Sequence, residues 1–237
     1  MTSSVSCHMR LLLNSTVRAL CPLIEQEIGG RSTRYLREYD LRRELVGCIL
    51  GSQVRYEMAV AATENLEHAG LLNDVYWLDC KDDDFEFRVL EVLVGRYDAR
   101  PHRGSYRFPK VRAKQLAQTK NALARVPLTS RLACSEAPKR LRTNLVEEIP
   151  GLGPKQASMF LRNTGKSYDL AILDVHVLRF IEMQGILPIE KASINTVGRY
   201  EETERIVIDY AGSLGYPVGY LDLAIWATMK AVRELRI

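Results

Sequence analysis

The most informative part of the sequence is the stretch Ile149-Pro150-Gly151-Leu152-Gly153-Pro154-Lys155, which predicts a tight turn between two helices. Glycine suits positions where the backbone turns sharply or comes close to a ligand, and this stretch has two of them. Lys155 follows at the start of the second helix. Nineteen positions later, Asp174 lies in Leu173-Asp174-Val175-His176, at the start of another apolar helix. The hairpin lysine and the helix-initiating aspartate are the strongest functional signal in the chain.

Helical signals dominate on both sides of this stretch. Gly29-Gly30 predicts the end of a first helix, and Asp82-Asp83-Asp84 predicts the start of another, since carboxylates complement the helix dipole there. Residues 96–109 are expected to be a loop, and only residues 75–78 hint at a strand. The class is therefore all-α. The expected helices cover residues 9–27, 35–50, 54–68, about 82–94, 111–124, 138–149, 156–163, 175–183, 195–214 and 219–235.

Bulk properties exclude several classes of protein. A length of 237 residues suits one large domain or two modest ones. No apolar run approaches the ~20 residues that span a bilayer, and Asn14 and Arg18 interrupt the apolar stretch near the N-terminus. The five cysteines are scattered without a C-x-x-C pair. We therefore expect a cytoplasmic protein, nucleoid-associated if prokaryotic, with no membrane partner, no metal and no cofactor.

The net charge of +4 is unevenly distributed. One segment, residues 96–142, has thirteen basic residues and two acidic ones, so it carries about +11 and the remainder about −7 (4 − 11). Such asymmetry is typical of a surface that binds a polyanion. A solvated helical face is the alternative interpretation. The basic residues are Arg96, Arg100, Arg103, Arg107, Lys110, Arg112, Lys114, Lys120, Arg125, Arg131, Lys139, Arg140 and Arg142.

The hairpin has two interpretations from its residues alone. A glycine turn exposes backbone N–H groups at a helix N-terminus, and those donors suit a phosphate of any sequence, with Gly151 and Gly153 at the contact. Lys155 is then either one more phosphate contact or a nucleophile. Asp174 is either an N-cap, or a cap and a catalyst together. His176 is expected to be a packing or surface residue.

The chain resembles the helix-hairpin-helix (HhH-GPD) DNA glycosylases, from about Arg42 to Trp226. The runs Tyr106–Lys114, Phe160–Asn163 and Ala171–Asp174 look closest to the second, mainly archaeal, family of 8-oxoguanine DNA glycosylases. The resemblance implies two helical domains with the active site in the cleft between them. Residues 1–34 and 168–237 would form one domain and residues 35–167 a helical barrel domain with the hairpin. No cysteine follows Cys134, so the iron–sulfur cluster of some relatives is not expected.

The resemblance also implies roles for individual residues. Asp174 would stabilise the positive charge that builds on the sugar, and Lys155 would attack C1′ and form a Schiff base. The enzyme must first flip the base out of the duplex, and Gln53 matches the residue that fills the vacancy. A polar helix cap is the alternative for Gln53. The expected phosphate contacts are Arg55, Arg107, Lys110, Arg112 and Lys114.

The resemblance also implies a pocket for the flipped base. Asp222 and Trp226 are four residues apart, hence on one helix face, and could recognise a flipped base by its edge and its ring. Packing in the core is the alternative for Trp226. The family ends on a lysine whose carboxylate helps to recognise the oxidised guanine, whereas this chain ends with Arg236-Ile237.

Three functions stay open on the sequence. The first is an 8-oxoguanine DNA glycosylase with AP lyase activity, acting as a monomer on double-stranded DNA that contains the modified base. The second is a glycosylase for another modified base, such as a hypermodified cytosine in phage DNA, which would be an antiviral defence. The third is a non-catalytic helix-hairpin-helix module that only binds DNA.

Overall fold

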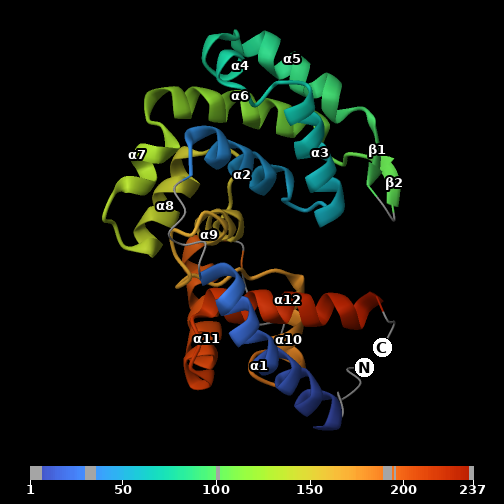
Figure 1. Ribbon diagram of the computed structural model, residues 1–237, viewed down its shortest axis with the longest axis vertical. Coiled ribbons are helices and arrows are strands. Elements are labelled where there is room, and N and C mark those ends of the chain that lie inside the picture. Colours follow the sequence, from blue (N-terminus) through green and yellow to red (C-terminus); the bar gives the residue numbers. More distant parts are fainter. Residues whose placement is uncertain (1–6, 30–35, 100–101, 189–193, 195, 235–237) are drawn as a thin grey trace. The chain divides into compact units, whose positions relative to one another are not determined.

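The structure is a computed structural model that describes residues 7–29, 36–99, 102–188, 194 and 196–234 (Figure 1). By its internal contacts the chain divides into two compact units. Unit 1 comprises residues 1–34 and 165–237, and unit 2 comprises residues 35–164. Helices make up almost all of the regular structure, which confirms the predicted all-α class. Among the described residues, no helix combines the length and the apolar character that crossing a bilayer requires.

Unit 2 is a bundle of helices with one short hairpin of strands. Helix α5 packs against α6, α8 against α9, and α2 against both α3 and α9 (Figure 1). Its core includes Leu45, Ile49, Phe85, Leu116 and Phe160, none more than 1% exposed. The elements are α2 (Glu38–Leu50), α3 (Tyr56–His68), α4 (Asp74–Asp79), α5 (Asp82–Leu93), β1 (Arg96–Ala99), β2 (His102–Ser105), α6 (Pro109–Arg125), α7 (Leu128–Ala133), α8 (Pro138–Glu148) and α9 (Pro154–Asn163).

Two predictions for unit 2 are wrong. Residues 75–78 form part of helix α4 and not a strand, because one large side chain, Trp77, anchors the turn. Trp77 is 2% exposed, its ring meets Phe85 edge-on with centroids 5.3 Å apart, and the Arg42 guanidinium lies 5.1 Å from the ring centroid. A strand would place Val75 on the same face as Trp77, but Val75 is 70% exposed.

The second error concerns residues 96–109, which were expected to be a loop throughout. Strands β1 and β2 pair antiparallel, with Arg96 opposite Ser105 and Tyr97 opposite Gly104. Tyr97 holds the hairpin on the bundle because its ring is buried and its hydroxyl donates to the carbonyl of Val92 at 2.6 Å. Burial raises the pKa of Tyr97 to about 12.

Unit 1 is made from both ends of the chain. Helix α1 (Cys7–Gly29) packs against α12 (Val218–Glu234), and α12 also packs against α10 (Val175–Met183) and α11 (Val197–Leu214). Apolar residues at helical spacing on α1, Leu13, Val17 and Cys21, belong to the same buried cluster as Phe180 and Ile225. This periodicity explains why the first helix forms where the sequence predicts it, and α1 ends at Gly29 as expected.

Candidate active site

The predicted hairpin joins α8 to α9 through residues 149–153. Gly151 has φ +84°, a left-handed conformation that favours glycine, and the N–H of Leu152 donates to the carbonyl of Ile149 at 3.2 Å to close the turn. Gly153 is the N-cap of α9 with φ −87° and ψ 173°, which any residue adopts. The conformational need for glycine therefore holds at Gly151 only. Pro154 occupies the first position of α9, which suits its fixed φ.

Lys155 is the second residue of α9 and is half-buried. Its side chain is close enough to α2 to act electrostatically on the buried Cys48 thiol. Burial raises the pKa of Cys48 well above its usual value, Glu44 raises it further, and Lys155 and Arg162 oppose the shift. At the other end of α9, Asn163 Nδ2 donates to Glu44 Oε1 at 2.7 Å. Helix α2 thus packs against the helix that carries Lys155 and accepts a hydrogen bond from its C-terminal end.

Asp174 is the N-cap of α10, as predicted. Its Oδ1 accepts hydrogen bonds from the backbone N–H groups of His176 and Val177, both at 2.9 Å. Its Oδ2 accepts no hydrogen bond from the residues described. The carboxylate is half-buried. One oxygen therefore fixes the group, and the other is available to a ligand.

The segment before Asp174 belongs to no helix and to no sheet. Three buried side chains, from α11 and α12, replace a neighbouring strand by accepting its backbone hydrogen bonds. The N–H of Ala171 donates to Glu204 Oε1 at 3.0 Å, that of Ile172 to Asp222 Oδ2 at 2.7 Å, and that of Leu173 to Tyr200 Oη at 3.0 Å. We call Tyr200, Glu204 and Asp222 the clamp.

The place of Asp222 in the clamp corrects its predicted role. Asp222 is 1% exposed, and its carboxylate oxygen is committed to the backbone of Ile172. A side chain so enclosed is not placed to read the edge of a flipped base. Trp226, one turn further along α12, is half-buried, with the ammonium of Lys230 5.0 Å from its ring centroid. The two residues of the predicted pocket therefore differ, and Trp226 alone reaches the surface.

Gln53 has the conformation expected of a specialised residue. Its φ is +59°, and among the residues described no other residue except glycine has a positive φ. Such a conformation costs on the order of 1 kcal/mol or more and is often found at functional sites. The Gln53 side chain is exposed, on the turn between α2 and α3.

The turn that carries Gln53 accepts hydrogen bonds from one residue just before α6 and from one residue on α6. The Tyr106 hydroxyl donates to the carbonyl of Leu50 at 2.7 Å, and Arg112 Nη2 donates to the carbonyl of Ser52 at 2.9 Å. Burial raises the pKa of Tyr106 to about 12, although Arg112 opposes the shift.

Arg112 also connects this turn to the helix-hairpin-helix. Its Nη1 donates to Gln115 Oε1 at 2.6 Å, and a Cβ at Gly151 would lie 2.6 Å from that same oxygen. Arg112 is 7% exposed, and its guanidinium has two uncharged partners within the protein. These contacts leave the guanidinium little exposed surface for a phosphate, which argues against the predicted phosphate contact of Arg112.

The chain is similar to known proteins over most of its length. The family described as 8-oxoguanine DNA glycosylase (Ogg-HhH) matches residues 99–216. An 8-oxoguanine DNA glycosylase/AP lyase of Metallosphaera sedula is 36% identical over 184 residues, which cover 78% of this chain and 79% of that protein. The chain belongs to this glycosylase family. A protein of the same description from Thermotoga petrophila is 34% identical over 215 residues, 88% of this chain and 90% of the relative.

The fold of the glycosylase is similar as well. The crystal structure of the 8-oxoguanine DNA glycosylase of Thermotoga maritima matches with a TM-score of 0.68 at 26% identity, over 92% of this chain and 94% of that one. Membership of the helix-hairpin-helix glycosylases, and with it the prediction of an enzyme, is confirmed. The part of the glycosylase that the structure describes contains no group of side chains suited to hold a metal ion.

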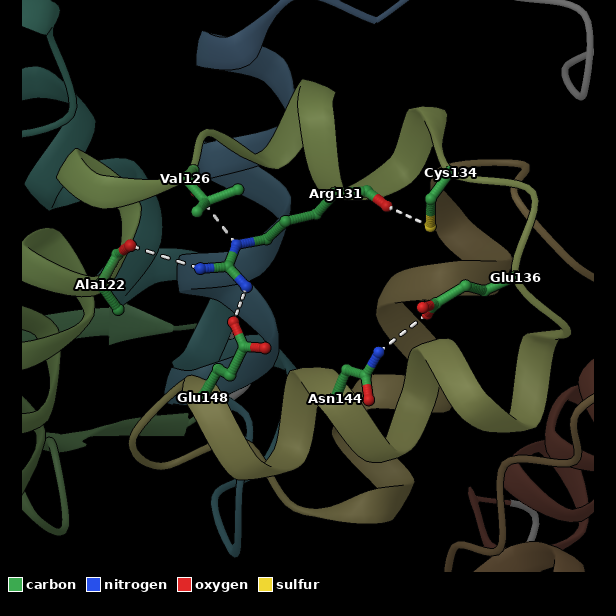
Figure 2. Close-up of polar contacts among 7 residues, drawn as sticks. All are labelled: Ala122, Val126, Arg131, Cys134, Glu136, Asn144 and Glu148. Carbon is green, nitrogen blue, oxygen red and sulfur yellow. Dashed lines mark hydrogen bonds and ion pairs between the residues drawn. The ribbon is translucent and has the colours of Figure 1, made fainter.

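The basic segment of the glycosylase serves two purposes. Several of its cations are used internally: Lys120 Nζ lies 3.0 Å from Asp82 Oδ1, and Arg142 is fully buried with Nη1 3.2 Å from Ser158 Oγ. Figure 2 shows Arg131, whose guanidinium donates to the carbonyls of Ala122 and Val126 and pairs with Glu148. This group ties the end of α6 to the end of α8, just before the hairpin.

Other cations of the segment face solvent. Lys110 and Lys114 are exposed on the first turns of α6, and Arg107 is exposed two residues before the helix, with its guanidinium 4.8 Å from the Phe108 ring centroid. Arg55, the N-cap of α3, is exposed too. These four predicted contacts remain available to DNA. Lys110 and Lys114 lie on α6, the same helix from which Arg112 donates a hydrogen bond to the Gln53 turn.

His176 packs as expected, in an unusual electrostatic setting. Burial lowers the pKa of the imidazole, Asp174 opposes that shift, and the cations Arg233, Lys230 and Arg179 add to it. The neutral imidazole is thereby favoured beside the catalytic candidate Asp174.

Three residues that contact the hairpin or the segment before Asp174 cannot be recognised from the sequence. Tyr200, Glu204 and Gln115 lie within helices at spacings that look like ordinary amphipathic positions. Only the structure shows that their polar atoms point at the segments carrying Asp174 and Gly151. The predicted C-terminal departure from the family, Arg236-Ile237, lies outside the described residues.

Proposed function

We propose that this glycosylase removes 8-oxoguanine from double-stranded DNA and then cleaves the strand at the abasic site. The names of its relatives support the substrate and the lyase step. The observation that carries the proposal is Asp174, whose Oδ1 is fixed by two backbone N–H groups while Oδ2 has no partner in the described residues. A carboxylate held in this way is suited to stabilise a developing cation.

The proposed reaction uses the two residues in sequence. As the glycosidic bond breaks, its electron pair leaves with the base, and the Asp174 carboxylate stabilises the positive charge that remains on the sugar. The Lys155 amine forms a bond to C1′ and loses a proton, and opening of the sugar ring gives a Schiff base. Proton loss from C2′ then expels the 3′ phosphate, which is the lyase step.

Lys155 must be neutral to attack. Lys155 belongs to unit 2 and Asp174 to unit 1, so the proposal requires the two units to act on the same nucleotide.

The remaining site residues have supporting roles in the proposal. The backbone of residues 151–153 and the exposed Arg55, Arg107, Lys110 and Lys114 bind phosphates, which positions the duplex without reading its sequence. Gln53 enters the space that the flipped base leaves. Trp226 stacks on the flipped base. All these residues come from one chain, so one copy of the protein suffices for each lesion.

Borohydride trapping tests the proposal on a duplex with 8-oxoguanine opposite cytosine. The wild type should form a covalent adduct, and Lys155→Gln should form none while it still binds the duplex. Lys139→Gln, at an exposed lysine on α8, is the matched control and should be trapped like the wild type. Undiminished trapping of Lys155→Gln would remove Lys155 from the mechanism. A wild type that releases a different base from a panel of modified duplexes would overturn the substrate alone.

A further inference from the structure

The clamp buries three polar side chains in a core, which is energetically less favourable than burying apolar ones. Its three side chains are at most 1% exposed, and two of them carry carboxyl groups. Burying a polar group is unfavourable unless it is hydrogen-bonded, and apolar residues of similar size often stabilise a core as well or better. All three groups are instead aimed at one short backbone segment, which ends next to Asp174. We propose that Tyr200, Glu204 and Asp222 are positioning residues that place the Asp174 carboxylate for catalysis.

The geometry of the clamp fixes the backbone residue by residue. Tyr200 hydrogen-bonds to the segment on both sides of Ile172. Its hydroxyl donates to the carbonyl of Ala171 at 2.7 Å and accepts from the N–H of Leu173 at 3.0 Å. Asp222 takes the N–H of Ile172 between them. The N–H of Asp174 then turns back to the carbonyl of Ile172 at 2.8 Å.

Asp174 is consequently held from two directions. The clamp fixes the backbone that leads into it, and the first turn of α10 fixes its Oδ1. Electrostatic stabilisation of a transition state depends on groups that are already in place, and a displacement of about 1 Å can cost ~100-fold in rate. The inference rests on the proposed role of Asp174, through which the clamp would act.

Two single-hydroxyl deletions in the same helix make the test. Tyr200→Phe keeps the ring in the core and removes the hydroxyl that grips residues 171 and 173. Tyr210→Phe is the matched control, since its hydroxyl accepts a hydrogen bond from Asn14 Nδ2 at 2.6 Å but forms none with the described segment before Asp174. Three quantities are measured for each variant: the single-turnover rate of 8-oxoguanine excision, the affinity for the duplex, and the free energy of unfolding.

We expect Tyr200→Phe to slow excision by about 10- to 100-fold, with unchanged affinity for the duplex. Borohydride trapping on a duplex with a preformed abasic site should fall less than excision, because no base is expelled there and less positive charge has to be stabilised. Tyr210→Phe should behave like the wild type in both assays. An excision rate of Tyr200→Phe equal to that of Tyr210→Phe, or equal losses of excision and trapping that follow the folded fraction, would overturn the proposal.

Two further variants separate this inference from the function on which it rests. Asp174→Asn should excise far more slowly than the wild type. If it is fully active, the role of Asp174 fails, whereas an inactive Asp174→Asn beside an unaffected Tyr200→Phe refutes the clamp alone. Asp222→Asn retains a carbonyl oxygen for the N–H of Ile172 and should excise faster than Asp222→Leu, which has no acceptor; equal rates of the two folded variants would contradict the inference.

Discussion

The two carboxylate oxygens of Asp174 have different surroundings and can therefore have different roles. Oδ1 accepts two backbone hydrogen bonds and begins helix α10, so it belongs to the fold. Oδ2 has no partner among the described residues, and in the proposed reaction it stabilises the positive charge on the sugar. A residue that is used only as a cap could be serine, threonine or asparagine. The charge of aspartate is required by the proposed reaction and not by the helix.

Trp226 is the residue at which substrate binding can be separated from general DNA binding. Stacking of a base on an aromatic ring is worth ~1–3 kcal/mol, so Trp226→Ala should slow excision by about 10- to 100-fold and change the affinity for an undamaged duplex much less. The measurements are single-turnover excision and a binding titration on the two duplexes. Trp226→Phe, which keeps a ring, should retain most of the activity. An alanine variant with the wild-type excision rate would exclude Trp226 from the base pocket.

At the scale of residues, the sequence predicted the hairpin and the helix cap better than it predicted tertiary contacts. Lys155 and Asp174 were named as a catalytic pair by resemblance to the helix-hairpin-helix glycosylases, and their roles stay predictions. The sequence identified Arg112 and Asp222 as site residues but predicted other contacts for them than the structure shows. A charged residue on a helix has the same sequence pattern whether its side chain faces DNA or a backbone group of the protein. The burial of Arg112 and Asp222, 7% and 1% exposed, depends on neighbours that are distant in sequence.

At the scale of elements, the hairpin offers a matched pair of glycines. Gly151→Ala should lower the free energy of unfolding by about 1–2 kcal/mol, because φ is +84° there and the new Cβ would press on the Gln115 side chain. Gly153→Ala should have a smaller effect, because φ is −87° and the nearest atom, Gln156 Oε1, is 3.2 Å from the new Cβ. Denaturant titrations of both variants test this. Equal losses would show that space, and not the left-handed conformation, determines the need for glycine.

The helices were predicted well where capping and periodicity agree. Asp82 at the start of α5, Asp174 before α10 and Gly29 at the end of α1 all mark the boundaries that the structure has. Short elements were predicted poorly, because tertiary contacts form them: α4 depends on the burial of Trp77, and the β1–β2 hairpin depends on that of Tyr97. In both cases local propensity is weaker than the burial of one aromatic ring.

At the scale of the whole molecule, the charge distribution makes DNA binding depend on salt. Each phosphate contact contributes about 0.9 to the slope of log affinity against log salt concentration. Lys110→Ala should flatten the slope by about that amount, since this lysine is exposed at the start of α6, near the Gln53 turn. Arg125→Ala, at the exposed far end of the same helix, should leave it unchanged. Equal slopes for Lys110→Ala and the wild type would place the DNA surface elsewhere.

The construction of unit 1 from both ends of the chain has a consequence for biosynthesis. The ribosome makes α1 well before α12, although the two helices pack together, so the apolar face of α1 has no partner helix α12 until that helix has been made. At roughly 5–20 residues per second the delay is on the order of ten seconds or more. Unit 2 is continuous and has all its own contacts once residue 164 emerges. A nascent chain can therefore contain the complete helical bundle of unit 2 while α1, which precedes it in the sequence, still exposes its apolar face. Chaperones bind exposed apolar surfaces of this kind.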